Sequence, residues 1–306
     1  MEKRKRDFQV SVVVTVRNEA ATIGRLLVAL EKQSRKPDEV ILVDGGSSDK
    51  TVQKIKDFSG ELSVRTIAIG RVNRAKGRNI GIKAATSDVI VVTDGGCTPQ
   101  PKWLQRLIRP LIQERVDAVA GYYQVRTKSA WQQAVAPFVA VLPERFNPET
   151  FLPSSRSLAF TKKTWKEIGG YNEQMDNCED LDFASKLKKT GGMVVEPEAK
   201  VEWELAGNFK EFFWQIFGYA LGDMEGWYWP HVVKIATIFG RYVLFYFYPV
   251  LFLGYIVLFP LAKHWRGVSK PKAWLYLPLV QLVADGGVMS GALSGMFIWF
   301  RRKLAW

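Results

Sequence analysis

The segment Val89–Trp103 reads VIVVTDGGCTPQPKW and carries the signal that decides the fold. Its first five residues, Val89 to Thr93, are aliphatic or β-branched, which is typical of a strand buried on both faces of a parallel sheet. Asp94 follows directly, and the glycines and prolines after it end both strand and helix. The sequence therefore predicts an acidic side chain at the carboxyl end of a central strand, where open α/β sheets bind ligands. A cap on a turn is the alternative role for Asp94.

Further strands and helices alternate in front of this segment. Apolar residues recur at helical spacing between Ala20 and Lys32, whereas short continuous apolar runs mark the strands. This alternation predicts an α/β fold with a doubly wound, mainly parallel sheet and right-handed crossovers. The strands are expected at Gln9–Val16, Glu39–Val43 and Val64–Ile69, and the helices at Ala20–Lys32, Asp49–Phe58 and Arg74–Ala84.

Charge and cysteine content narrow the class of protein. The formal net charge of +13 favours anionic partners such as phosphorylated ligands and anionic lipid. The sequence has no nucleic-acid-binding motif, so nucleic acid is not an expected partner. Cys97 and Cys178 do not suggest a disulfide framework and fit a reducing cytosol. The amino-terminal run lacks a small-residue cleavage site and is not interpreted as a secretory signal.

The carboxyl-terminal third is far more apolar than the rest. The aromatic-rich segment Asn208–Trp229 predicts a helix in the lipid headgroup layer. Tyr242–Ala262 is free of charge and long enough to span about 30 Å of hydrocarbon. A second apolar run, Leu275–Phe300, is interrupted only by Asp285, which we expect to be structural or to face an acceptor. Within that run, small residues recur every fourth position and predict close packing against another helix, namely Gly287, Gly291 and Gly295.

Two apolar runs predict a membrane-spanning hairpin that leaves the amino-terminal part and Arg301–Lys303 in the cytoplasm. The segment between the runs opposes this topology, because its basic residues would then face outward against the positive-inside tendency. A re-entrant or surface-lying pair of helices is the alternative. The basic residues in question are Lys263, Arg266, Lys270 and Lys272.

Several motifs in a fixed order resemble one known family. The nucleotide-sugar half of the family 2 glycosyltransferases, which have the GT-A fold, is similar to VVVTVRNEAATIGRLLVAL, VDGGSSDKT and GRNIGIKAATSDVIVVTDGGC. The acceptor half of that family is similar to SLAFTKKTWKEIGGYNE and NCEDLDFASKLKKTGG. The resemblance covers roughly residues 8 to 205.

The resemblance implies a set of site residues. Asp180 is the implied catalytic base with Glu179 as its orienting neighbour, and Asp44 is the implied contact to the nucleotide base. Asp94 is the implied ligand of a divalent cation, Mg²⁺ or Mn²⁺, and Arg78 lies where the family keeps a basic residue near the diphosphate. The implied nucleotide-sugar-binding residues are Thr15, Arg17, Glu19, Asp44, Arg78, Asp94, Gly95 and Glu179.

Simpler roles compete with these assignments. Arg78 can belong to a solvated helix face, and acidic residues such as Glu179 and Asp180 are favourable in any first helical turn. The family's metal loop usually contains Asp-x-Asp, whereas this chain has Gly96 at the second position. One carboxylate can hold Mg²⁺ together with phosphates and water, so Gly96 weakens the metal prediction without removing it. Arg17 stands where the family often has an aromatic residue.

These observations predict four regions. The catalytic GT-A domain covers residues 1–205, with a nucleotide-sugar half at 1–98 and an acceptor half at 99–205. An interfacial helix at 206–231 and a membrane region at 232–306 follow. The expected protein is a membrane-anchored inverting glycosyltransferase of cell-envelope biogenesis, with its catalytic domain in the cytoplasm. It would move a sugar from a nucleotide-sugar donor to a lipid-linked or cell-envelope glycan acceptor.

Two other functions remain open. A processive polysaccharide synthase is disfavoured, because Gln215–Tyr219 lacks the Gln-x-x-Arg-Trp signature that such members of the family carry. A catalytically weak, nucleotide-binding pseudoenzyme is the second alternative, and Gly96 is the residue that supports it.

Overall fold

The computed structural model describes residues 8–113, 116–269 and 271–304. The basic amino-terminal start, residues 1–7, and Lys270 of the basic segment lie outside the described residues. The described chain divides into two compact units. Unit 1 contains Asn147–Trp203 and the described residues up to Gln124, and unit 2 contains Val125–Phe146 and the described residues from Glu204 onward.

An eight-stranded mixed sheet forms the centre of unit 1, with the order β3-β2-β1-β4-β7-β6-β8-β5. The pairs β3–β2, β2–β1 and β1–β4 are parallel, whereas β4–β7, β7–β6 and β5–β8 are antiparallel. The strands are β1 (Val10–Val16), β2 (Glu39–Asp44), β3 (Val64–Ala68), β4 (Val89–Asp94), β5 (Cys97–Pro99), β6 (Ala118–Arg126), β7 (Leu158–Thr161) and β8 (Met193–Glu204).

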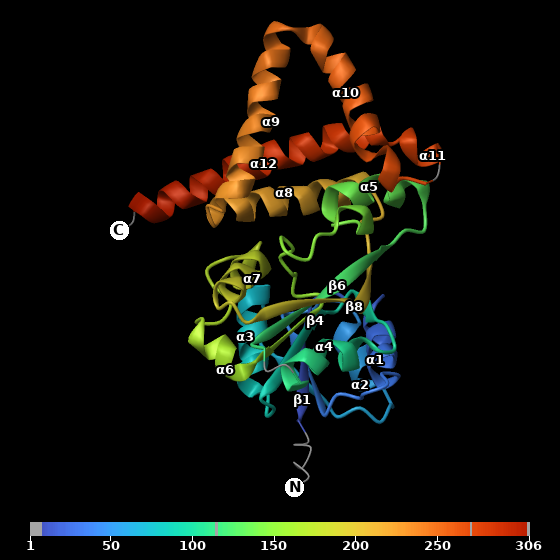
Figure 1. Ribbon diagram of the computed structural model, residues 1–306, viewed down its shortest axis with the longest axis vertical. Coiled ribbons are helices and arrows are strands. Elements are labelled where there is room, and N and C mark those ends of the chain that lie inside the picture. Colours follow the sequence, from blue (N-terminus) through green and yellow to red (C-terminus); the bar gives the residue numbers. More distant parts are fainter. Residues whose placement is uncertain (1–7, 114–115, 270, 305–306) are drawn as a thin grey trace. The chain divides into compact units, whose positions relative to one another are not determined.

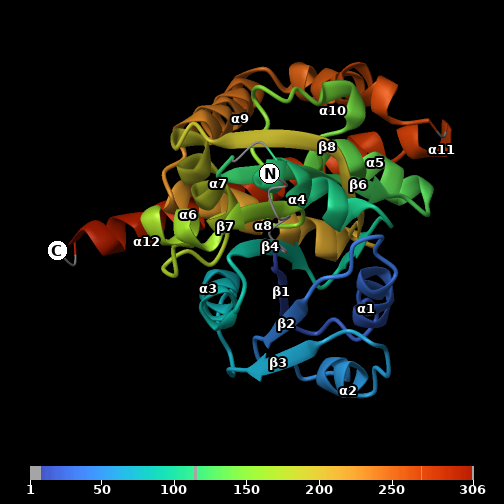
Figure 2. The ribbon, with the colours of Figure 1, turned by 60° about the horizontal axis from the view of Figure 1, so that its bottom comes forward.

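Helices cover both faces of the parallel part of the sheet. Figure 2 shows α3 on one side of β1–β3, and α1 and α2 on the other. The predicted GT-A-like, doubly wound, mainly parallel α/β fold is therefore confirmed. The helices of unit 1 are α1 (Ile23–Glu31), α2 (Thr51–Lys56), α3 (Arg74–Ala84), α4 (Trp103–Gln113), α6 (Lys162–Glu167) and α7 (Glu179–Lys189).

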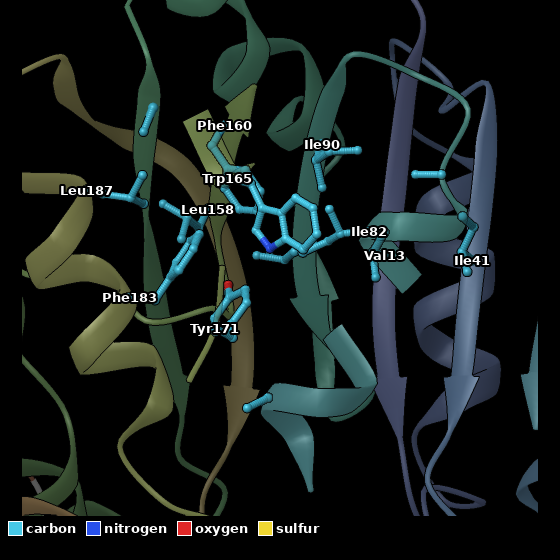
Figure 3. Close-up of a cluster of buried hydrophobic side chains, with 14 of the residues drawn as sticks. Val13, Ile41, Ile82, Ile90, Leu158, Phe160, Trp165, Tyr171, Phe183 and Leu187 are labelled. Carbon is cyan, nitrogen blue, oxygen red and sulfur yellow. The ribbon is translucent and has the colours of Figure 1, made fainter. Parts of the chain in front are cut away.

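One buried hydrophobic cluster holds α3 and α7 against the sheet (Figure 3). Ile82 from α3 and Phe183 and Leu187 from α7 contribute to it together with strand residues such as Ile90 and Phe160. Burial of each such side chain contributes about 1.5–3 kcal/mol. The cluster therefore fixes the two helices that carry Arg78 and Asp180 relative to the same sheet.

Helices make up most of unit 2. Trp131 of α5 and Phe212 of α8 belong to the same hydrophobic core as Leu277 and Val280 of α12. The helix α5 is thus part of the hydrophobic core of unit 2. The elements are α5 (Ala130–Val139), the 3₁₀ turn η1 (Pro143–Arg145), α8 (Phe209–Glu225), α9 (Trp229–Phe247), α10 (Pro249–His264), the 3₁₀ turn η2 (Trp265–Gly267), α11 (Pro271–Trp274) and α12 (Leu277–Leu304).

The long helices α8 and α12 lie side by side (Figure 1). A methyl group added to Gly291 would lie 2.2 Å from the carbonyl oxygen of Phe217, and one added to Gly295 would lie 2.4 Å from that of Leu221. Gly287 would meet Ile216 at 3.1 Å. The close approach predicted from the spacing of these glycines is therefore confirmed, and α8 is the partner helix.

The apolar run Tyr242–Ala262 is not one helix, so the expectation of a single span there is wrong. The helix α9 ends at Phe247, and α10 begins at Pro249. Tyr248 between them has φ −131° and ψ 73°, because a residue before proline is disfavoured in the α region. The two helices form a hairpin with its turn at Tyr248 (Figure 1). Among the described helices, only the stretch Leu277–Arg301 is long and apolar enough to cross a membrane.

Asp285 is buried where α9, α10 and α12 meet. Its carboxylate accepts hydrogen bonds from the hydroxyl of Tyr255 at 2.8 Å and from that of Tyr242 at 3.2 Å. The amide of Gln281 donates a third hydrogen bond at 2.9 Å. These bonds agree with the structural role that was one of the two expectations for Asp285.

Candidate active site

The carboxyl ends of three parallel strands bring acidic residues to one edge of the sheet. In the register of β1 with its neighbours, Val16 lies opposite Asp44 and Thr15 lies opposite Asp94. Asp44 is buried, whereas the side chain of Asp94 keeps 26% of its surface exposed. The edge predicted from the sequence as the ligand-binding end is therefore the place where these carboxylates lie.

The loops that follow β1 and β2 are tied to each other. The backbone amide of Asn18 donates to the hydroxyl of Ser47 at 2.9 Å, and that of Glu19 donates to the hydroxyl of Thr51 at 2.7 Å. Asp44 accepts from both the amide and the hydroxyl of Ser47. Asn18 has φ +56°, a left-handed conformation that non-glycine residues adopt mainly where the surroundings impose it. Glu19 is thus held in place next to the sheet edge.

Arg78 links the two halves of the catalytic unit. Its Nη2 donates to Oδ1 of Asp94 at 2.7 Å, and its Nη1 donates to Oε1 of Glu179 at 2.5 Å. The side chains of Arg78 and Glu179 are each only 2% exposed. Burial lowers the pKa of the guanidinium, but the two carboxylates more than offset this and hold that pKa above its ordinary value. Arg78 therefore lies on a buried helix surface and not on a solvated one.

The ring of Tyr171 lies 5.3 Å below the guanidinium carbon of Arg78 and stacks on Phe183 of α7 at 3.9 Å. The neighbouring Asn79 donates to the carbonyl of Tyr171 at 2.8 Å and accepts from its amide at 3.0 Å. Gly170 has φ +68° and leaves no room for a side chain, because an added methyl would lie 2.8 Å from Nε1 of Trp165. This packing fixes the loop that leads into α7.

Glu179 and Asp180 open α7, as the sequence predicts. The residue before them, Cys178, has φ +56° and turns the chain sharply into the helix. Burial, followed by the adjacent Glu179 carboxylate, raises the pKa of Asp180, and the nearby guanidinium groups of Arg156 and Arg78 only partly oppose this. Asp180 is thus a half-buried carboxyl group with a pKa above its ordinary value, which suits a proton acceptor.

Two arginines of this region were not singled out from the sequence. Burial raises the pKa of Asp94, but Arg78, Arg156 and Arg74 more than offset this effect, and the pKa lies below its ordinary value. The guanidinium carbon of Arg156 lies 3.9 Å from the ring centre of Trp203, which orients it by a cation–π contact. Arg156 lies in the loop before β7, where no periodic pattern marks it; Arg74 is the first residue of α3.

A divalent cation requires oxygen ligands near Asp94. The described residues contain no group of three His, Cys, Asp or Glu side chains suited to a metal ion. However, a methyl group added to Gly96 would lie 3.7 and 3.8 Å from the two carboxylate oxygens of Glu19. The Glu19 carboxylate thus lies within contact distance of the point where a side chain at position 96 would begin. Asp94 and Glu19 are the carboxylates that would hold Mg²⁺ or Mn²⁺ there, together with phosphate and water.

The structure accordingly brings together Arg78, Asp94, Glu179 and Asp180, and it places Glu19 and Gly95 beside Asp94. Thr15 lies opposite Asp94 on the neighbouring strand β1, and Asp44 ends β2, the strand on the other side of β1. Arg17 is exposed directly after β1. The individual roles of these residues stay predictions.

The comparisons with known proteins agree with this fold. Residues 11–165 match the model of glycosyl transferase family 2, and the chain belongs to this family. It is 33% identical over 116 residues to glycosyltransferase AglE of Haloferax volcanii, a match that covers 37% of this chain and 38% of the relative. It is also 33% identical over 131 residues to an undecaprenyl-phosphate 4-deoxy-4-formamido-L-arabinose transferase of Pectobacterium carotovorum, covering 40% of this chain and 38% of that protein.

The matches thus span about two fifths of the length of these relatives. Among solved structures, residues 1–349 of S. aureus TarS in complex with UDP superpose with a TM-score of 0.53 at 16% identity. That match covers 96% of this chain and 92% of the TarS chain. At this level of identity the likeness concerns the fold.

Proposed function

We propose that this protein is an inverting glycosyltransferase that moves a sugar from a nucleotide-sugar donor to a hydroxyl group of a lipid-linked or cell-envelope glycan. The observation that carries the proposal is the bridge that Arg78 makes between Asp94 and Glu179. This bridge joins the donor-side strand end to the helix that presents Asp180. A site for two substrates requires such a junction, because donor and acceptor must meet at one reacting carbon.

On the donor side, Asp44 contacts the nucleotide base, and Thr15, Arg17 and Gly95 complete the binding edge. Arg78 acts as a positioning residue for Asp94 and Glu179, since both of its terminal nitrogens are bonded to carboxylates. Its direct contact with the diphosphate stays a prediction from the family resemblance. Arg74 and Arg156, which lower the pKa of Asp94, bring positive charge to the side of Asp94 where the diphosphate would lie.

Asp94 and Glu19 would hold a divalent cation, Mg²⁺ or Mn²⁺. When bound, this cation supplies charge neutralisation for the departing nucleoside diphosphate. Two carboxylates are enough, because Mg²⁺ usually keeps several waters and binds substrate phosphates.

Asp180 takes the proton of the acceptor hydroxyl in the transfer step. The hydroxyl oxygen forms a bond to the anomeric carbon while the bond between that carbon and the diphosphate oxygen breaks. The bonding electrons leave with the nucleoside diphosphate, and the proton passes to the Asp180 carboxylate. Attack opposite the leaving group inverts the configuration at the anomeric carbon. Positioned bases of this kind contribute about 10² to 10⁴ in rate.

A lipid-linked acceptor is supported by the undecaprenyl-phosphate transferase among the relatives and by the apolar helices of unit 2. A catalytic unit on the cytoplasmic side of the membrane would meet nucleotide sugars where they are made.

The test is transfer and hydrolysis of radiolabelled nucleotide sugars by the purified full-length chain in mild detergent. We expect turnover with one donor, and a loss of about 10² to 10⁴ for Asp180→Asn with donor affinity unchanged. Asp182→Asn is the matched control, because it removes a carboxylate from the same helical turn that pairs with Lys186 instead. Binding without turnover by the unaltered protein would establish the pseudoenzyme, and long polymeric products would establish the processive synthase.

A further inference from the structure

The α9–α10 hairpin presents an apolar tip. Tyr246 and Val250 on either side of the turn are each 81% exposed, and Phe247 between them is 68% exposed. No charged residue occurs from Tyr242 to Ala262. Contiguous exposed apolar surface of this kind marks a site of interaction with lipid or protein.

The polar groups of the hairpin point inward. Arg241 of α9 donates to the hydroxyl of Tyr255 on α10 at 2.9 Å, and that hydroxyl donates to the buried Asp285 of α12 at 2.8 Å. In the charge-free part around the turn, residues 242–262, the outer surface is apolar, and the hydrogen-bonded polar groups lie in the interior. This distribution is expected for helices in contact with lipid, where charged side chains face the protein interior.

We propose that the α9–α10 hairpin inserts into one leaflet of an anionic bilayer and does not cross it. The uncharged part of α9, Tyr242–Phe247, rises about 9 Å, and that of α10, Pro249–Ala262, rises about 21 Å. Half of the hydrocarbon core measures about 15 Å, and a span needs about 20 apolar residues per helix. Both arms are shorter than the full hydrocarbon core of about 30 Å, so the turn between them lies inside the core and does not reach the opposite side.

The residues at the open end of the hairpin support this depth. The exposed Trp265 (55% exposed) directly follows α10, close to the end of its uncharged arm, and tryptophan prefers the headgroup level. If the hairpin crossed the bilayer, Phe247 and Val250 would instead lie in the opposite headgroups or in water.

Charge identifies the lipid surface. The exposed Lys234, Lys263 and Lys272 lie beyond the uncharged arms, on the open side of the hairpin, and the chain carries a net charge of +13. Basic residues near a membrane surface favour anionic lipid. Because the turn is at Tyr248, the basic segment after α10 lies on the same side of the membrane as the start of α9. The sequence alone suggests that Tyr242–Ala262 and Leu275–Phe300 both cross the membrane, which would place this basic segment on the outer side. With the turn at Tyr248 the segment stays on the side where α9 begins, and the conflict with the positive-inside tendency disappears.

The helix α12 would lie along the membrane surface. Its glycines pack against the backbone of α8, and α8 carries charged residues at both ends, including Lys210 and Glu225. A spanning α12 would draw these charges into hydrocarbon, at a high free-energy cost. In Figure 1 the hairpin projects from the side of the α8–α12 pair. The hairpin can therefore enter the bilayer while this pair of helices lies along the surface.

The experiment uses the full-length chain and sealed vesicles of phosphatidylcholine, with and without phosphatidylglycerol. The double variant Phe247→Asp/Val250→Asp should lose about a hundredfold or more in co-flotation with vesicles. Val28→Asp, at an exposed valine of α1 (40% exposed), is the matched control and should bind as the unaltered protein does. Near-ultraviolet circular dichroism in detergent checks that the variants are folded. Binding of the double variant equal to that of Val28→Asp would overturn the proposal.

Depth is measured separately on Val250→Cys in a Cys178→Ser background, labelled with an environment-sensitive dye. We expect quenching by acyl-chain spin labels deep in the bilayer, and no reaction of the unlabelled thiol with an impermeant maleimide on either side of the vesicles. Reaction from inside the vesicles would mean that the hairpin spans. Failure to bind vesicles, combined with a dimer that the double variant dissociates, would assign the apolar tip to a second copy of the chain; either result overturns the proposal.

Discussion

Replacement of Arg78 by methionine should destabilise the protein far more than the loss of an ordinary ion pair. The change removes the positive charge between Asp94 and Glu179 but keeps an apolar side chain of similar length. Glu179 is 2% exposed and loses a hydrogen bond of 2.5 Å. Asp94 loses one of 2.7 Å but is 26% exposed, so water can replace part of that contact.

The magnitude follows from the burial of the partners. Removal of one partner of a buried ion pair costs about 3–5 kcal/mol, because the other charge is left uncompensated. Since Asp94 is partly solvated, we expect the free energy of unfolding to fall by an amount near the lower end of this range, about 3 kcal/mol. This is a large fraction of a typical total of about 5–15 kcal/mol. The double variant Arg78→Met/Glu179→Gln should recover part of the loss, with a coupling of about 1–3 kcal/mol.

Urea unfolding in mild detergent, followed by tryptophan fluorescence, measures these free energies. Arg106→Met is the matched control, because Arg106 pairs with Glu198 at 3.6 Å between side chains that are 38% and 58% exposed. Such a surface pair contributes at most about 1 kcal/mol. A loss for Arg78→Met no larger than that for Arg106→Met would refute the reasoning that the bridge is buried and structural.

Three further predictions concern the base, the metal and the helix packing. The transfer rate should fall as pH is lowered through the raised pKa of Asp180, because the protonated carboxyl cannot accept a proton. The residual rate of Asp180→Asn should not show this fall at acidic pH. The same acidic fall in both pH–rate profiles would contradict the assignment of Asp180 as the base. Glu19→Gln should weaken Mn²⁺ binding in the presence of UDP by about tenfold or more, and adding Gly96→Asp to that variant should restore the binding. The spin-resonance signal of free Mn²⁺ measures both affinities. Unchanged Mn²⁺ affinity in Glu19→Gln would exclude Glu19 as a ligand. Gly291→Ala should destabilise the α8–α12 pair by about 1–3 kcal/mol, because the added methyl meets the Phe217 carbonyl oxygen at 2.2 Å. Gly240→Ala is the control and should not destabilise the protein, because no atom lies within 4 Å of the added methyl. Equal midpoints of thermal unfolding for the two variants would argue against close packing of α8 and α12.

The sequence predicts the parallel half of the fold well, because its strands are short runs of β-branched residues between helices with regular apolar spacing. The ends of β4 and β2 also follow from Asp94 and Asp44, since glycines come immediately after both. By contrast, the partners of Arg78 lie 16 and 101 residues away in the chain, and no local pattern reports a contact of that range. Arg156 was missed for the same reason.

The error at Tyr248 has a different origin. Charge-free length alone suggested one span from Tyr242 to Ala262, although Pro249 was visible in the sequence. A residue that precedes proline resists the helical conformation, and here the break reverses the chain. The position of proline therefore outweighs hydropathy in deciding whether this run is a span or a hairpin. The glycine repeat of α12 was more informative, because close backbone approach depends on the absence of side chains and is read directly from the sequence.

The balance of charge at the proposed active site explains how Gly96 can be tolerated. Asp94, Glu179 and Asp180 carry three negative charges when ionised, and Arg78 is already bonded to two of these carboxylates. A nucleoside diphosphate adds further negative charge, which Arg74 and Arg156 alone would have to offset. A divalent cation held by Asp94 would offset part of this charge, and Glu19, whose carboxylate lies near Gly96, could supply the second carboxylate. Because binding linkage is reciprocal, donor and cation should then raise each other's affinity. If Glu19 supplies this carboxylate, Gly96 does not mark a lost metal site, and the Mn²⁺ affinity of Glu19→Gln then decides whether Gly96 still supports the pseudoenzyme alternative.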